Sequence, residues 1–271
     1  MDNITVVFCE GQHDIAFLSK ILYVHGYKEY KEKLKVFKEP LGEQYLSILR
    51  EEKNISEKKL GFNPIYKIPS VALSKDNELV LFHNMGGDGR KSERSKLLEM
   101  YKNLQGDDDF SESNLNYKFL YFFDADENPK EERIQSLNDE LDLALEDNII
   151  LEHNGCKWGC YVFHKDKNGG YLEDVLLDLM KPTNETIFKN TEAFISANIL
   201  TPIKRQSEYK PFSGIYNNKC KFKDIKSIIS IAGQLQFSGM SNAVIIGKSD
   251  YITKSDIENN EVCKDIINLF G

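Results

Sequence analysis

The sequence predicts an α/β fold in which a mostly parallel sheet is flanked by helices. The first observation is an alternation of short apolar runs with segments of helical periodicity. The second is that turn residues or carboxylates follow several of the apolar runs directly. Strand–helix alternation implies right-handed crossovers, which bring the loops after the strands to one edge of the sheet.

Four apolar runs are the expected strands. Each is rich in aromatic or branched residues and lacks a regular polar alternation, which is typical of strands covered on both faces. A helix is expected after the first strand, with Gly26 as its stop, and another begins at Pro129. A short helix is expected over residues 172–180. The strands are residues 4–10, 79–83, 118–123 and 160–163.

The chain divides into an α/β domain and a helical extension. Residues 1–180 carry the strand–helix units, with a Lys- and Glu-rich segment at about 28–78 that predicts a mostly helical surface insertion. Beyond Pro182 the strand signal weakens and helical spacing dominates. We therefore expect residues 181–271 to form a mainly helical C-terminal extension that packs on the first domain.

Composition restricts the classes of protein. The chain is 41% hydrophobic and 29% charged, which is typical of a folded protein and excludes wholesale disorder. No apolar run approaches the roughly 20 residues that a membrane span needs. Asp2 stands where a secretory signal would be basic. We therefore expect a cytoplasmic protein with no membrane partner, and we expect its five cysteines to be reduced thiols.

The net charge of −8 argues against indiscriminate binding of nucleic acid. Charge is uneven, however, because residues 201–230 hold seven basic residues against two acids. Such a surplus suits either a patch that faces phosphate or an ordinary solvated surface, and the sequence leaves both open. The basic residues are Lys204, Arg205, Lys210, Lys219, Lys221, Lys223 and Lys226.

Carboxylates stand at the ends of two predicted strands. Glu10 ends the first strand, and Asp14 follows in the first turn of the next helix. Asp124 and Asp126 follow the third strand, and an i, i+2 spacing on an extended chain puts two side chains on one side. Carboxylates at close quarters repel unless a cation is present. The four acids therefore predict a site for Mg²⁺ or Mn²⁺, with one ion or two.

Other motifs suggest further ligands. The glycines of residues 86–89 leave backbone amides free to contact a phosphate, although they match no nucleotide-binding pattern. His153, Cys156, Cys160 and His164 have a spacing that suits zinc. Since Cys160 falls in a predicted core strand, we expect buried thiols there instead. We expect His13 to lie on the surface and Trp158 to pack in the core.

The motifs around the acids resemble those of toprim (topoisomerase-primase) domains. Val6 to Asp14 is similar to their first motif, E-G-x-x-D after an apolar strand, and Leu120 to Asp126 is similar to their D-x-D motif. Gly86-Gly87 falls where toprim domains carry a glycine after the second strand. The resemblance covers about residues 4–150 and implies a Rossmann-like sheet.

A closer resemblance is to a small, uncharacterised bacterial toprim-like family related to nucleases of the overcoming-lysogenization-defect type. It rests on the Gly159 strand, on Gly170 to Asp174, on a lysine-led helix from Lys226 to Ala232, and on residues 239–243. With these motifs the resemblance extends over nearly the whole chain.

The resemblance implies chemistry on phosphodiester bonds. Glu10 would act as acid/base and metal carboxylate, Asp124 and Asp126 would ligate metal, and Asp14 would complete the cluster. Glu173 and Asp174 either bind a second metal or only favour a helix start. Gly11, Gly86, Gly87 and Lys226 are the candidates for contact with phosphate, with a solvated lysine as the alternative for Lys226. No tyrosine nucleophile, zinc module or P-loop supports the strand-passing, primase or ATP-driven activities of other toprim proteins.

Three functions follow. The first is a Mg²⁺- or Mn²⁺-dependent nuclease acting on DNA or RNA. The second is a non-catalytic toprim-fold module that binds nucleic acid or a nucleotide and regulates a partner. The third is a nucleotide-sugar transferase that uses Asp124 and Asp126 to hold a metal–diphosphate, but this function leaves Glu10 and Gly11 unexplained.

Overall fold

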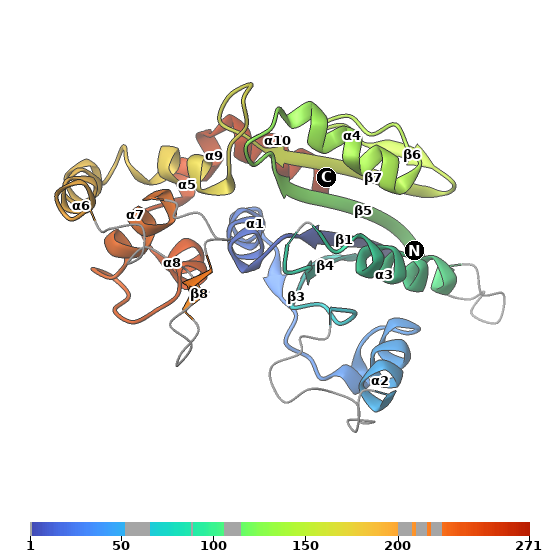
Figure 1. The fold of residues 1–271 in the computed structure, drawn as a ribbon. Helices are drawn as coiled ribbons and strands as arrows, with labels where there is room; N and C mark the ends of the chain where they lie inside the picture. Colours follow the sequence, from blue (N-terminus) through green and yellow to red (C-terminus); the bar gives the residue numbers. More distant parts are fainter. Residues whose placement is uncertain are drawn as a thin grey trace.

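A central sheet lies between two layers of helices in the computed structural model (Figure 1). The structure describes residues 2–51, 66–87, 89–105, 115–199, 208–209, 216–217 and 224–271. Apart from Lys226, the basic residues of the predicted patch lie outside these ranges. Residues 52–65 of the predicted insertion also lie outside them.

The sheet has seven strands in the order β2-β3-β4-β1-β5-β7-β6. The central strands β4, β1, β5 and β7 are parallel, and β2, β3 and β6 join antiparallel at the two edges. The strands are β1 (Asp2–Cys9), β2 (Lys28–Glu29), β3 (Val71–Lys75), β4 (Glu78–Asn84), β5 (Leu115–Asp124), β6 (Leu151–His153) and β7 (Cys156–Phe163). A separate hairpin pairs β8 (Glu208–Tyr209) with β9 (Tyr216–Asn217).

The α/β class and the four predicted strands are confirmed, since those strands are the parallel centre β1, β4, β5 and β7. The sheet is mixed, since the four predicted strands are parallel to one another and β2, β3 and β6 join antiparallel at the edges. The prediction of a mostly helical insertion is wrong in part, because residues 28–78 also form β2 and β3. β3 turns directly into β4 through Asp76 and Asn77, and Asp76 has a left-handed backbone with φ 51°.

One face of the sheet is covered by three helices that pack on alternate strand residues. Val6 and Phe8 of β1 lie in this core beside Phe119 and Tyr121 of β5. Phe8 and Tyr121 stack with their ring centroids 4.5 Å apart. The covering helices are α2 (Leu41–Glu51), α3 (Lys91–Gln105) and α4 (Lys130–Leu141), with a short 3-10 helix η1 (Leu34–Val36) before α2.

The opposite face is covered by α1 together with the helices of the C-terminal part. Val7 and Cys9 of β1 and Phe122 of β5 point into this second core. Strand residues therefore alternate between two buried faces, as expected for strands that are apolar throughout. The helices are α1 (Gln12–Val24), α5 (Leu172–Met180), α6 (Glu185–Ala197), α7 (Asp224–Gly233), α8 (Asn242–Lys248), α9 (Lys254–Asn259) and α10 (Glu261–Phe270).

The helices after residue 181 share one core with α1 and the sheet. Phe270 at the end of α10 stacks on Phe122 of β5, with 5.9 Å between ring centroids. α8 packs along α1, and Lys20 of α1 donates to the carbonyl oxygen of Ser249 at 2.7 Å. The helical character predicted for this part is confirmed, and the division at residue 180 stays a prediction. Among the described helices, none is long and apolar enough to cross a membrane.

Candidate functional site

The carboxyl ends of β1 and β5 bring Glu10 and Asp124 together. The two strands are neighbours, with Cys9 paired to Phe122, so each strand ends beside the other. Oε1 of Glu10 accepts a hydrogen bond from the backbone N–H of Asp124 at 3.1 Å. Residues separated by more than a hundred positions in sequence thus form one cluster, as the sheet-edge argument predicts.

Asp14 joins this cluster from the first turn of α1. Its Oδ2 accepts a hydrogen bond from the backbone N–H of Gly11 at 2.8 Å, which caps the helix. Asp14 is buried, yet it lines the same cavity as Glu10 and Asp124. Asp14 therefore caps α1 and also lines the cavity.

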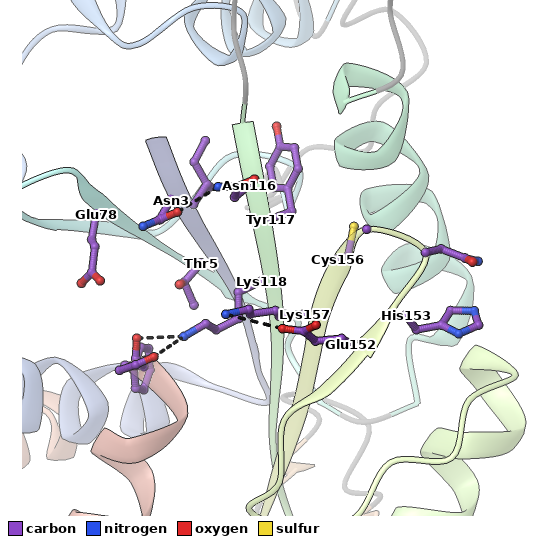
Figure 2. Close-up of a pocket in the computed structure, with 15 residues that line it drawn as sticks. Asn3, Thr5, Glu78, Asn116, Tyr117, Lys118, Glu152, His153, Cys156 and Lys157 are labelled. Carbon is purple, nitrogen blue, oxygen red and sulfur yellow. Dashed lines mark hydrogen bonds and ion pairs between the residues drawn. The ribbon is translucent and has the colours of Figure 1, made fainter. Parts of the chain in front are cut away.

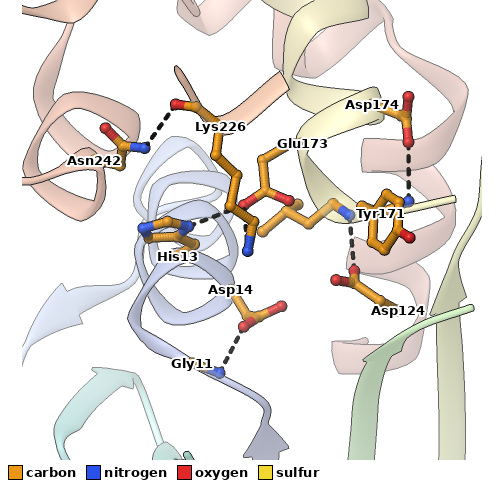
Figure 3. Close-up of polar contacts among 10 residues, drawn as sticks. Gly11, His13, Asp14, Asp124, Tyr171, Glu173, Asp174, Lys226 and Asn242 are labelled. Carbon is orange, nitrogen blue, oxygen red and sulfur yellow. Dashed lines mark hydrogen bonds and ion pairs between the residues drawn. The ribbon is translucent and has the colours of Figure 1, made fainter. Parts of the chain in front are cut away.

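Asp124 is tied to the start of a second helix. Its Oδ1 accepts from the backbone N–H of Leu172, the first residue of α5, at 2.7 Å. The amino ends of α1 and α5 thus both reach the cavity (Figure 3). Because the first amides of a helix have no partner within the helix, two such ends at one cavity favour an anion there.

We call Glu10, Asp14 and Asp124 the inner triad. Among the described residues, no lysine, arginine or histidine lies within ion-pair distance of any of the three. Burial, together with the neighbouring charges of Asp14 and Glu10, raises the pKa of Asp124 to about 8 against the opposing hydrogen bond from the Leu172 amide. Burial also raises the pKa of Glu10 to about 7 and that of Asp14 to about 6. Crowded, desolvated carboxylates of this kind are stabilised by a cation.

Glu173 lies on the other wall of the cavity and has cationic neighbours. Its Oε1 is 3.0 Å from Nδ1 of His13 and 3.4 Å from Nζ of Lys226 (Figure 3). Burial alone would raise the pKa of Glu173, but the hydrogen bond to His13 and the charge of Lys226 outweigh it and lower that pKa. Within the described residues, Oε2 of Glu173 is buried and has no hydrogen-bond partner.

Asp126 does not lie beside Asp124 in the way that an extended D-x-D predicts. Asp126 has a left-handed backbone with φ 58°, and its side chain pairs with Arg133 at 2.8 Å. The side chain is 41% exposed, and it is not among the residues that line the cavity. The i, i+2 argument fails here because β5 ends at Asp124, so Asp126 is no longer on an extended chain.

Asp174 also lies apart from the inner triad. Its Oδ2 accepts from the backbone N–H of Tyr171 at 3.0 Å and so caps α5, while its Oδ1 is 3.3 Å from Nζ of Lys165. Of the pair Glu173 and Asp174, only Glu173 lines the cavity. This arrangement matches the helix-start alternative for Asp174.

The predicted phosphate contacts divide in the same way. Gly11, Gly87 and Lys226 line the cavity, whereas Gly86 does not. Gly87 donates its N–H to the carbonyl oxygen of Glu10 at 2.9 Å, so its amide is already used. Its φ of 114° is a left-handed value that suits glycine. Asp88 of this loop lies outside the described residues.

The cavity is open and has a volume of about 290 Å³, and seven of its ten lining residues have polar or charged side chains. Its walls come from the ends of β1 and β5, the first turns of α1 and α5, the Gly87 loop and α7 (Figure 3). It is lined by Glu10, Gly11, Gln12, His13, Asp14, Gly87, Asp124, Leu172, Glu173 and Lys226.

The inner triad fits a divalent metal in its donor chemistry. Three carboxylates supply the hard oxygen ligands that Mg²⁺ and Mn²⁺ prefer, and their pKa values are raised first by burial and then by the repulsion of neighbouring carboxylates. In the part of the chain that the structure describes, no three His, Cys, Asp or Glu side chains are already spaced as a closed metal site. Mg²⁺ commonly binds through one or two carboxylates and several waters, so a closed site is not required.

A second and larger cavity, of about 440 Å³, lies at the opposite edge of the sheet (Figure 2). Its lysines contact a carboxylate or the backbone, and Glu78 accepts a hydrogen bond from the hydroxyl of Tyr27. Lys118 donates to the carbonyl oxygens of Leu269, Phe270 and Gly271 at 2.9–3.2 Å, and Lys157 pairs with Glu152 at 3.8 Å. Lys118 therefore caps the carboxyl end of α10, and we place the chemistry in the smaller cavity.

The residues that suggested zinc belong to the core and to an edge strand. Cys160 is buried in β7, as its strand pattern predicts, and Cys156 donates to Oε1 of Gln105 at 3.1 Å. His153 is exposed on β6, and Nδ1 of His164 lies 3.0 Å from the carbonyl oxygen of Val162. Trp158 is buried against Phe119, which is the packing role expected for it.

The cavity position of His13 and the contacts of Arg133 do not follow from the sequence. His13 lies on the cavity wall because Glu173, 160 positions away, holds its ring. Arg133 binds both the Asp126 side chain and, through Nε, the carbonyl oxygen of Asp124 at 3.0 Å. Arg133 lies on the first turn of α4, just after the D-x-D motif. This position alone does not predict a contact with Asp126, which forms because the backbone of Asp126 is left-handed.

The fold and the site define an α/β protein with a carboxylate-lined cavity at the carboxyl edge of its parallel strands. The chain belongs to the DUF3226 family, described as a protein of unknown function, which matches residues 4–221. The matched segment includes the inner triad and Glu173 and ends before Lys226.

A solved structure has a similar fold. It is the crystal structure of hypothetical protein PH0156 from Pyrococcus horikoshii OT3, with a TM-score of 0.53 and 18% sequence identity. The similarity covers 100% of this chain and 94% of that chain, and at this identity it supports the fold alone. No curated protein matches the chain.

Proposed function

We propose that the protein is a Mg²⁺- or Mn²⁺-dependent enzyme of phosphodiester bonds, a toprim-like nuclease acting on DNA or RNA in the cytoplasm. The observation that carries this proposal is the inner triad. Buried Asp14 and half-buried Glu10 and Asp124 face one cavity, all with raised pKa values, and all without an ion-pair partner among the described residues. A site that binds a cation and a phosphate together relieves this repulsion and uses both helix amino ends.

Glu10, Asp14 and Asp124 would hold the metal. When bound, the ion would polarise a phosphoryl oxygen and stabilise the charge that develops on the leaving oxygen. The placement of Glu10 and Asp124 agrees with the toprim motifs that they resemble. Asp126 is the departure, because its carboxylate is bound to Arg133 at the side of the cavity.

The chain's own groups supply the rest of the chemistry. Glu10 faces the cavity and would accept a proton from an attacking water, the acid/base role that its resemblance to the toprim motif implies. The amino ends of α1 and α5 favour a negatively charged group at the cavity. Lys226 and His13 on the facing wall add cationic contacts for a phosphate.

The test is cleavage of plasmid DNA, single-stranded DNA and RNA with Mg²⁺ or Mn²⁺. We expect metal-dependent cleavage by the wild-type chain and a loss of at least about 100-fold in Glu10→Gln and Asp124→Asn, since each removes a group that acts on the reaction. Asp126→Asn should lose less than Asp124→Asn, because Asp126 lies outside the cavity. The matched control is Asp178→Asn, an exposed carboxylate on α5.

Equal background cleavage by wild type, Glu10→Gln and Asp124→Asn would reject the enzyme. Binding of oligonucleotides without cleavage would instead favour the non-catalytic module. The transferase alternative is weakened, because Asp124 and Asp126 do not face one cavity.

A further inference from the structure

Lys226 is the cation that the protein itself brings to the carboxylate cavity. The residue lies near the start of α7, and its side chain extends toward Glu173 and Asp14 (Figure 3). Its Nζ lies 3.4 Å from Oε1 of Glu173, and Lys226 lines the cavity together with the inner triad. Partial burial lowers the Lys226 pKa, but the charges of Glu173, Asp124 and Asp14 outweigh it and raise that pKa.

The backbone that carries Lys226 is held in place. Its carbonyl oxygen accepts from Nδ2 of Asn242 at 3.2 Å, and Ile229 and Ala232 of the same helix are buried in the core. The side chain itself is 46% exposed. An anchored backbone with a long, half-exposed side chain allows the ammonium to leave the cavity without a rearrangement of α7.

The charges around the cavity are unequal. Four carboxylates line it, namely the inner triad and Glu173, against one lysine and His13. His13 contacts only Glu173 among these acids, and Oε2 of Glu173 has no partner within the described chain. Lys226 contacts Glu173 and lines the cavity beside the inner triad, where its charge also acts on Asp124 and Asp14. The charge of His13 acts on Glu173 and on Asp14 but not on Asp124.

We propose that the Lys226 ammonium is the resident counter-ion of this cavity and that a divalent cation binds in competition with it. This inference rests on the proposed function, because it concerns the same metal. Two cations cannot compensate the same carboxylates without repelling each other. Lys226 thereby weakens metal binding in the free protein, and its displaced ammonium is left at the cavity mouth, where an anionic phosphate would meet it.

The test is calorimetric titration of the metal-free protein with Mn²⁺. Lys226→Met keeps the aliphatic length and removes the charge, so we expect Mn²⁺ to bind about tenfold more tightly than to wild type, a gain of about 1.4 kcal/mol. Without metal, Lys226→Met should melt at a lower temperature, and saturating Mn²⁺ should remove that difference. Lys226→Gln is the second neutral variant in case the methionine disturbs folding.

Two controls separate charge from other effects. Lys226→Arg keeps the charge and should bind Mn²⁺ within about twofold of wild type. Lys165→Met removes a lysine that pairs with Asp174 outside the cavity and should leave Mn²⁺ affinity unchanged. Unchanged or weaker Mn²⁺ binding in both neutral variants would overturn the competition and leave the metal site intact. An absence of Mn²⁺ binding in every variant would instead reject the proposed metal site itself, and the competition with it.

Discussion

At the scale of single residues, the acids that the sequence groups together have different surroundings. The inner triad accepts its hydrogen bonds from the backbone amides of Asp124, Gly11 and Leu172. Glu173, Asp126 and Asp174 each have a cationic side chain beside them. Sequence spacing identifies which carboxylates reach the sheet edge. Sequence spacing does not identify which carboxylates have a cationic side chain beside them, because Arg133, Lys165 and Lys226 come from separate parts of the chain.

The most buried histidine predicts a dependence of stability on acid. His83 is fully buried, and burial lowers its pKa from 6.5 to about 4. Its Nε2 contacts the hydroxyl of Tyr101 at 2.7 Å, and its Nδ1 contacts the carbonyl oxygen of Tyr66 at 2.8 Å. Since the unfolded chain binds the proton more readily, stability from this group is complete above pH 6.5 and is lost as the pH falls toward 4.

The measurement is urea unfolding of wild type and His83→Leu between pH 4 and pH 7.5. Both carry the inner triad, whose raised pKa values act in the opposite direction, so the difference between the two proteins isolates His83. As the pH falls from 7.5 to 4, the unfolding free energy of wild type should decrease by on the order of 3 kcal/mol more than that of His83→Leu. Parallel pH profiles for the two proteins would contradict the prediction.

At the scale of elements, the loop before α5 is fixed against the D-x-D turn. The backbones of Asp126 and Gly170 exchange two hydrogen bonds of 3.0 and 2.9 Å, so the turn and the loop hold each other. Gly169 has φ 126°, and a Cβ there would lie 2.2 Å from the carbonyl oxygen of Asp126. Only glycine allows this approach, and the start of α5 at the cavity depends on it.

Gly169→Ala should therefore destabilise the protein by about 2 kcal/mol or more, because both the backbone strain and the collision must be relieved. Gly247→Ala is the matched control. Gly247 lies in α8, and a Cβ there would meet only ordinary contacts with Ala16 at 3.7 Å or more, so that variant should be neutral or gain up to about 1 kcal/mol. Urea unfolding measures both, and equal effects of the two variants would refute the argument.

The strands that the sequence predicted are those that make the parallel centre, and the strands that it missed are the edges. β1, β4, β5 and β7 are buried on both faces, which gives continuous apolar runs that are easily recognised. β2 has two residues and β6 has three, too few for a pattern. β3 has a usable signal in the turn at Asp76-Asn77, but it falls in an insertion whose Lys- and Glu-rich residues 28–60 indicate helices.

At the scale of the whole molecule, the C-terminal helices complete the core of the sheet. Phe270 is 2% exposed and stacks on Phe122 of the central strand β5. Phe270→Ala should cost about 3–5 kcal/mol of unfolding free energy, which is usual for a fully buried phenylalanine. Phe194 on α6 is 57% exposed, and Phe194→Ala should stay within about 0.5 kcal/mol of wild type.

Thermal and urea unfolding, followed by both tryptophan fluorescence and circular dichroism, test this prediction. Trp158 lies on the opposite face of the sheet from Phe270. An equal decrease in the unfolding free energy of Phe270→Ala by both probes would therefore show that the two faces unfold as one cooperative unit. A Phe270→Ala variant that unfolds in two separate steps would contradict a shared core.

The cavity draws its walls from residues that are far apart in the chain, and this distance has a consequence for biosynthesis. Glu10 is made early, Asp124 near the middle, Glu173 later, and Lys226 close to the end. Contacts of such high sequence separation form slowly, and domains emerge from the ribosome in order from the amino terminus. A nascent chain that ends before α7 contains the four cavity carboxylates but lacks Lys226. The complete charge arrangement therefore exists only once α7 has been synthesised.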